Sequence, residues 1–141
     1  MEVMSWYKIA QEEYDYEKTP QKELQGIAGS FENDNQVAPD PGAGQANEFH
    51  WVYFPEFPIE RFLSGNMSSE EWVMHFDNEQ KMAAEDGREG YYDDMILKPI
   101  KEPIVAVDLG SEMAIWDGYH RVGASFKKGA KTIRAIIGKR L

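Results

Sequence analysis

Hydrophobic residues alternate with polar or small ones in the C-terminal third of the chain. Val105, Val107 and Leu109 lie at a spacing of two, which places their side chains on one face of an extended segment. This alternation predicts a strand over residues 102–109 with these side chains on its buried face. Further segments rich in β-branched, aromatic or aliphatic residues are predicted as strands: residues 51–59, 113–116 and 132–137.

A helical pattern occupies the middle of the chain. Ser68, followed three residues later by Glu71, is typical of a capping box at a helix N-terminus. Trp72, Val73 and Phe76 then predict the buried face of a helix that ends near residue 84. The glycine-containing polar run that follows predicts a loop over residues 85–94.

Prolines and glycines set the expected boundaries nearer the N-terminus. Trp6, Ile9 and Ala10 share one helical face, and Pro20 is expected to end or interrupt that helix. The segment that follows is rich in Gly, Pro, Asn and Asp, so it cannot bury enough apolar surface to offset its ordering entropy. The predicted organisation is an N-terminal helical and acidic arm (residues 1–25), a flexible linker (residues 26–48) and a folded domain (residues 49–141).

The expected fold class is α+β, with a small mixed sheet flanked by helices in one compact domain. Pro55 and Pro58 fall in the first predicted strand, and prolines confine a strand to an edge of the sheet or end it. Gly110 and Ser111 predict a hairpin turn between the second and third strands, and Gly129 fits the end of a helix that precedes the last strand.

The composition limits which cellular compartment and which classes of binding partner we expect. The 141 residues include no cysteine, and no apolar run approaches the length of a membrane helix, so we expect a cytoplasmic protein with no membrane partner. A formal net charge of -10 opposes a general affinity for nucleic-acid backbones. The basic residues near the C-terminus fit a small anionic ligand better than a long polyanion: Lys127, Lys128, Lys131, Arg134, Lys139 and Arg140.

One segment carries candidate chemistry. A short apolar strand ends in Asp117-Gly118 and is followed directly by a predicted helix that begins near His120 and Arg121. The first amides of a helix lack intrahelical partners and, with the helix dipole, attract anions. Gly118 permits a sharp turn, Arg121 can fork two hydrogen bonds onto a phosphate, and His120 can donate or titrate near neutral pH. The alternative is an ordinary Asp-Gly turn before a solvated helix end.

The motif Asp117-Gly118-Tyr119-His120-Arg121 resembles the Asp-Gly-x-His-Arg pattern of the ParB N-terminal and sulfiredoxin-like superfamily, also described as the ParB-like nuclease domain. The likeness continues through the Ala-containing helix over residues 122–129 and the Ile-x-Ala-x-Ile pattern over residues 133–137. Upstream, the Glu-Pro-Ile-Val segment at residues 102–105 is similar to the strand that precedes the motif in that family. Sulfiredoxin activity requires a cysteine where this chain has Tyr119, and it is therefore excluded.

The resemblance implies nucleotide binding. ATP or CTP phosphates would lie at Asp117, Gly118, Tyr119, His120 and Arg121, with His120 and Arg121 on phosphate oxygens and the helix amides beneath them. Asp117 would fix the turn or face a Mg²⁺ ion. Glu102 and His120 are the candidate catalytic residues of a phosphotransferase or a triphosphatase, a hydrolase in which positioning and charge stabilisation do most of the catalysis.

Two other functions stay open at this stage. The superfamily also suggests a ParB-like nuclease or a DNA-associated factor, although DNA is less favoured as a partner because the chain is acidic. A non-enzymatic adaptor could instead keep the fold and engage a protein partner through the acidic, tyrosine-rich N-terminal arm.

Overall fold

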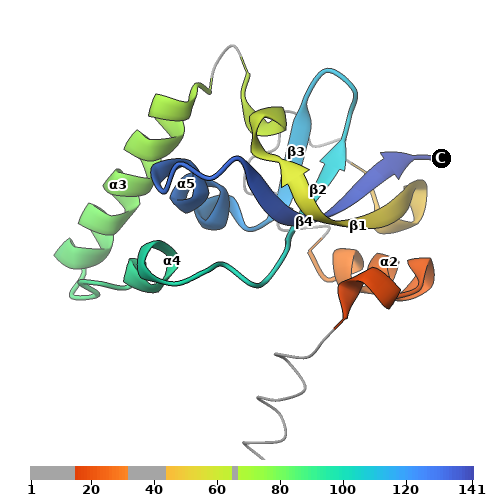
Figure 1. The fold of residues 1–141 in the computed structure, drawn as a ribbon, viewed down its shortest axis with the longest axis horizontal. Coiled ribbons are helices and arrows are strands. Elements are labelled where there is room, and N and C mark those ends of the chain that lie inside the picture. Colours follow the sequence, from red (N-terminus) through yellow and green to blue (C-terminus); the bar gives the residue numbers. More distant parts are fainter. Residues whose placement is uncertain (1–14, 32–43, 65–66) are drawn as a thin grey trace, which may run out of the picture.

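The computed structural model describes residues 15–31, 44–64 and 67–141 (Figure 1). The amphipathic helix expected around Trp6 lies outside the described residues. The helices are α2 (Gln21–Gly29), α3 (Ser69–Glu85), α4 (Asp93–Leu97) and α5 (Tyr119–Lys127), with short 3₁₀ turns at Tyr16–Lys18, Ala46–Glu48 and Ile59–Phe62. The strands are β1 (Phe49–Pro58), β2 (Ile104–Asp108), β3 (Met113–Asp117) and β4 (Thr132–Arg140).

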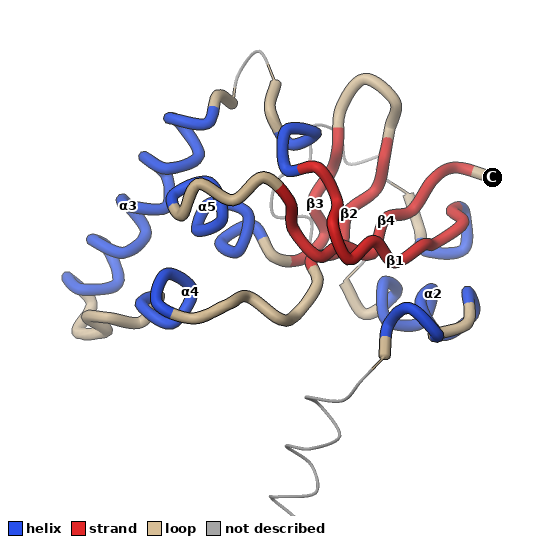
Figure 2. The backbone as a smooth tube through the Cα atoms, viewed as in Figure 1, coloured by secondary structure: helices blue, strands red, loops and turns tan. Residues whose placement is uncertain are grey.

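The four strands form one mixed sheet in the order β1-β4-β2-β3 (Figure 2). β4 pairs antiparallel with β1 and parallel with β2, while β2 and β3 form an antiparallel hairpin that turns at Gly110. The predicted α+β class and mixed sheet are therefore confirmed. The edge position of β1 is confirmed as well, and its register with β4 shifts between Phe54 and Phe57, around Pro55.

Both faces of the sheet are covered, which the sequence pattern did not predict. Val105 and Val107 are buried on the face that packs against α2, whereas Ile104 and Ala106 are buried on the face that packs against α3 and α5. In Figure 1, α2 lies on one side of the sheet and α3, α4 and α5 on the other. The predicted face of Val105 and Val107 is buried, against α2, but the expectation that only one face of residues 102–109 is buried was wrong, because α3 and α5 cover the face of Ile104 and Ala106.

The core begins upstream of Phe49. Pro20 occupies the N-cap position of α2, so a helix begins directly after it, while the helix that Pro20 was expected to end or interrupt begins outside the described residues. Leu24 and Ala28 of α2 are buried with Ala46 in the same cluster as Trp51, and the Trp51 indole donates a hydrogen bond to the Ala46 carbonyl oxygen at 2.8 Å. Parts of the predicted arm and linker thus belong to the packed structure, while residues 32–43 of the linker lie outside the described residues.

The helical prediction in the middle of the chain is confirmed with two corrections. Ser68 caps α3 by accepting a hydrogen bond from the Glu71 amide, and Trp72 and Phe76 are buried, whereas Val73 is only partly buried. The polar loop predicted over residues 85–94 ends at residue 92, because Asp93 begins α4. Tyr92 is buried, with its ring 5.8 Å from that of Phe76, so an aromatic side chain anchors the region predicted as a loop.

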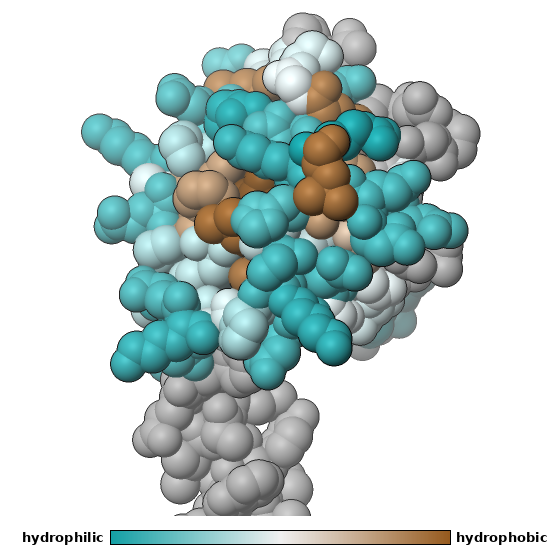
Figure 3. Space-filling view, turned by 90° about the vertical axis from the view of Figure 1, so that its right-hand side faces the viewer, coloured by the Kyte–Doolittle hydropathy of each residue, from teal (hydrophilic) through white to brown (hydrophobic). Residues whose placement is uncertain are grey.

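Hydrophobic side chains on the outside are scattered. The face shown in Figure 3 is mostly hydrophilic, with small separate groups of hydrophobic side chains among the polar ones. No helix formed by the described residues is both long and apolar enough to cross a membrane.

Candidate functional site

The junction between β3 and α5 has the strand, turn and helix geometry that the sequence predicts. Gly118 is the N-cap of α5 and has a φ of 101°, a left-handed backbone conformation that residues other than glycine rarely adopt. A Cβ atom added at Gly118 would lie 2.5 Å from Cγ2 of Ile104. Among the described residues no side chain caps this helix end. The turn therefore brings the backbone close to β2 and presents the positive end of the helix dipole.

Arg121 is held by protein oxygens. Its Nη1 donates to the carbonyl oxygen of Pro103 at 2.8 Å, and its Nη2 lies 3.1 Å from Oδ2 of Asp117 and 3.8 Å from Oε2 of Glu102. The side chain is only 17% exposed. The guanidinium thus ties the start of α5 to the end of β3 and to the residues before β2, and its orientation is fixed before any ligand binds.

Glu102 is the accessible member of this group. Its side chain is 73% exposed, compared with 23% for Asp117, and its contact with Arg121 is the longer of the two ion pairs. A phosphate that approached Arg121 would displace the Glu102 carboxylate more readily than Asp117, because less burial and a longer contact hold Glu102 in place.

His120 faces different partners. Its Nε2 lies 3.6 Å from Oε2 of Glu79 in α3 and 3.5 Å from the hydroxyl of Tyr92, and the Tyr92 ring stacks on the imidazole with centroids 4.7 Å apart. Successive residues of a helix point about 100° apart, which is why His120 and Arg121 diverge. The structure therefore brings Asp117, Glu102 and Arg121 together and places His120 in a second group beside them.

Tyr119 belongs to the second group. Its ring packs against Trp72 with centroids 4.9 Å apart. Burial raises the pKa of both Tyr92 and Tyr119, and the nearby Glu79 carboxylate raises each pKa further. Both phenols are therefore neutral hydrogen-bonding groups near pH 7. We call Glu79, Tyr92, Tyr119 and His120 the Glu79 cluster.

Sequence reasoning missed Glu79 and Tyr92. Glu79 lies at helical spacing with Trp72, Phe76 and Ala83, all buried on the inner face of α3. A carboxylate at that position of an amphipathic helix was a signal that could have been found, since charged residues are seldom placed toward a core without a partner. Tyr92 gave no comparable signal, because its neighbours in sequence are typical of a loop.

Asp117 was also predicted to face a metal ion. Within residues 15–31, 44–64 and 67–141, no three or more His, Asp or Glu side chains are grouped so that they could hold a metal ion. The Asp117 carboxylate accepts a hydrogen bond from Arg121. Mg²⁺ in nucleotide sites commonly takes much of its coordination from phosphate oxygens and water, and the ion would depend on them here.

Comparisons with protein-family models, with curated proteins and with solved structures found no match to this chain. The resemblance to the ParB and sulfiredoxin-like superfamily therefore rests on the motif and its spacing.

Proposed function

We propose that this chain binds the phosphate groups of ATP or CTP, with Mg²⁺, at the turn between β3 and α5. The observation that carries the proposal is the start of α5, which has no side-chain cap among the described residues, is entered through a left-handed Gly118 and has the fixed guanidinium of Arg121 beside it. The likeness of residues 117–121 to the Asp-Gly-x-His-Arg motif supports the same reading.

The groups around the turn have distinct roles in this proposal. The helix amides and the dipole attract the phosphate, and Arg121, oriented by Pro103 and Asp117, supplies a charge-assisted contact once Glu102 moves away. His120 donates from the other side of the helix start, where its Nε2 lies 3.6 Å from Oε2 of Glu79. Pre-orientation lowers the entropic cost of binding.

Hydrolysis or transfer of the nucleotide phosphate would depend on the same side chains around the turn. Glu102 is an exposed carboxylate beside the proposed phosphate position, so it is suited to handle a proton or to help hold Mg²⁺. We propose a phosphotransferase or triphosphatase activity in which Glu102 and His120 act on the bound nucleotide.

The test is calorimetric titration of the chain with ATP and with CTP, each with and without Mg²⁺, followed by a phosphate-release assay. His120→Ala is expected to weaken binding about tenfold through the loss of one charge-assisted hydrogen bond. His75→Ala is the matched control, because His75 is exposed on α3 and contributes to neither group of side chains. Glu102→Gln is expected to lower phosphate release while it leaves nucleotide affinity within about twofold.

The outcomes separate the functions that the sequence left open. Binding without phosphate release would reject the catalytic role and favour an adaptor or switch. If neither nucleotide binds, the proposed function fails, and retention of duplex DNA by the same sample would then favour a DNA-associated factor. Equal weakening in His120→Ala and His75→Ala would remove His120 from the site.

A further inference from the structure

A second candidate site lies at the opposite end of α5. A pocket of about 260 Å³ opens between the irregular part of β1, the loop after α5 and the start of β4. We call it the Lys128 pocket, and its lining includes Glu56, Ile100, Lys128, Thr132, Ile133 and Arg134. The helix between the two sites has nine residues, about 13 Å at the usual rise, so the pocket is separate from the turn at Gly118.

Two cationic side chains line this pocket, and neither pairs with a carboxylate of the residues that the structure describes. The Lys128 ammonium donates to the carbonyl oxygen of Lys98 at 2.9 Å, and the Arg134 guanidinium donates to the carbonyl oxygen of Lys101 at 3.2 Å. Among the ion pairs of the described residues neither cation takes part. Lys127, next in sequence to Lys128, is by contrast paired with Asp77 of α3.

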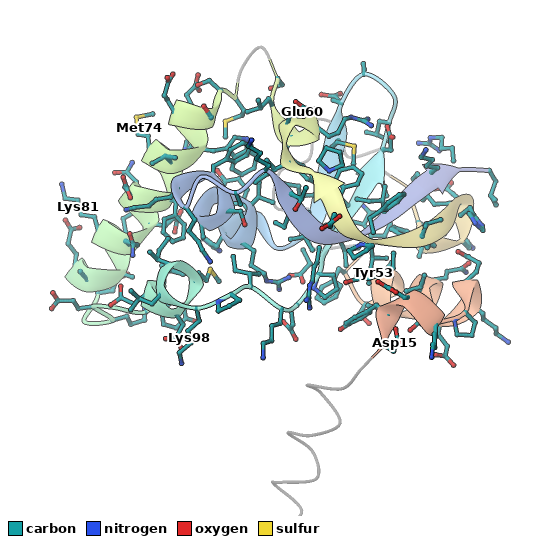
Figure 4. All side chains as sticks on the ribbon, viewed as in Figure 1. Asp15, Tyr53, Glu60, Met74, Lys81 and Lys98 are labelled. Carbon is teal, nitrogen blue, oxygen red and sulfur yellow. The ribbon has the colours of Figure 1, made fainter. Side chains whose placement is uncertain are left out.

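The two carbonyl contacts hold the cations in place. Lys98 and Lys101 belong to the segment after α4, on the side of the molecule where Figure 4 labels Lys98. Main-chain carbonyls carry only partial negative charge, so they orient an ammonium or guanidinium without neutralising it. In a chain with a formal net charge of -10, two cations that line one pocket give this concave surface a local positive potential.

The rest of the lining selects for a small ligand. Thr132 supplies a hydroxyl, Ile100 and Ile133 supply apolar wall, and Glu56 places a carboxylate on the pocket rim as part of the exposed stretch of β1. The volume is below the roughly 300–1,000 Å³ of pockets that hold drug-sized molecules. We propose that the Lys128 pocket binds a small organic anion, its carboxylate or phosphate group on Lys128 and Arg134 and its hydroxyl or amino groups toward Glu56.

Amide chemical-shift mapping on the full chain tests this proposal with two probes, L-malate and inorganic phosphate. We expect saturable shifts at residues 128–134 with at least one probe, at a Kd of about 1 mM or tighter. Lys128→Gln and Arg134→Gln should each weaken that binding by about tenfold, since each removes one charge-assisted contact. Lys139→Gln is the matched control, because it removes one positive charge from the far end of the same strand.

Each result decides the proposal. Saturable shifts at residues 128–134 with either probe, weakened about tenfold in both pocket variants and unchanged in Lys139→Gln, would support the proposal, and the probe that binds more tightly would identify the preferred anionic group. Shifts confined to residues 118–121, no saturable shift with either probe, or unchanged affinity in both pocket variants would overturn it. The nucleotide proposal is tested independently, because His120→Ala should leave the shifts at residues 128–134 intact.

Discussion

Arg121 Nη1 lies 2.8 Å from the carbonyl oxygen of Pro103, and this hydrogen bond ties the first turn of α5 to the residue before β2. Pro103 is buried, so its carbonyl is shielded from water that could replace the guanidinium. The same guanidinium contacts Asp117 at the end of β3. One side chain therefore joins three segments of the candidate site.

Arg121→Ala should destabilise the fold as well as affect ligand binding. It leaves the Pro103 carbonyl and the Asp117 carboxylate without their donor, which is expected to lower the free energy of unfolding by about 1–3 kcal/mol. Urea denaturation measures this change. Arg88→Ala is the control, because the Arg88 side chain is 52% exposed in its ion pair and should contribute less than about 1 kcal/mol. Equal effects of the two substitutions would contradict a structural role for Arg121.

Gly118→Ala should cost more than an alanine at another left-handed glycine. Gly87 has a φ of 80° with nothing within 4 Å of an added Cβ, so Gly87→Ala bears only the conformational cost of about 1–2 kcal/mol. At Gly118 the contact with Ile104 should add about 1–3 kcal/mol of overpacking. Thermal and urea unfolding of both variants measure the difference, and similar losses would show that β2 moves aside easily.

Two buried tryptophans allow a matched comparison of indole hydrogen bonds. The Trp51 indole donates to the Ala46 carbonyl, whereas Nε1 of Trp116 is buried without a hydrogen-bond partner among the described residues. Trp116→Phe removes an unsatisfied donor, whereas Trp51→Phe breaks a hydrogen bond. The free energy of unfolding should therefore be roughly 1–3 kcal/mol less reduced by Trp116→Phe than by Trp51→Phe. Equilibrium unfolding of the two variants gives this difference. A larger loss in Trp116→Phe would indicate that its indole nitrogen has a partner in solution.

Alkaline pH should lower the free energy of unfolding, because two tyrosines of the Glu79 cluster ionise. Burial, followed by the charge of Glu79, raises the pKa of Tyr92 and of Tyr119 above the usual value of 10.0. Their stabilisation is therefore fully present below about pH 10 and is lost as the pH rises from there through the raised folded pKa, because the unfolded state ionises first. Unfolding free energies measured across this range should fall with pH.

The double variant Tyr92→Phe, Tyr119→Phe tests the origin of that fall. It lacks both phenols, so its stability should decline less steeply above about pH 10 than that of the unsubstituted chain. Tyr53, whose pKa is also raised by burial, remains in this variant and should leave a residual slope. An unchanged slope would assign the alkaline loss to groups outside the Glu79 cluster.

Local chemistry made much of the fold predictable from sequence. Ser68 starts α3, Gly110 turns the β2–β3 hairpin, and Gly118 opens α5, because caps and turns depend on a few neighbouring residues. The prolines near residue 55 correctly indicated an edge strand, since proline cannot donate to a neighbouring strand. The Asp117-to-Arg121 segment was likewise recognisable as a strand, a turn and a helix start.

Contacts between distant segments decided the rest. The alternation of residues 102–109 predicted the buried face that α2 covers, but nothing in it specified that α3 and α5 pack on the other face, at Ile104 and Ala106. The sequence placed His120 and Arg121 side by side, but only the packing of α3, Tyr92 and Pro103 around α5 determined that they face different partners. Local propensity acts over a few residues, whereas these arrangements follow from which surfaces the folded chain buries together.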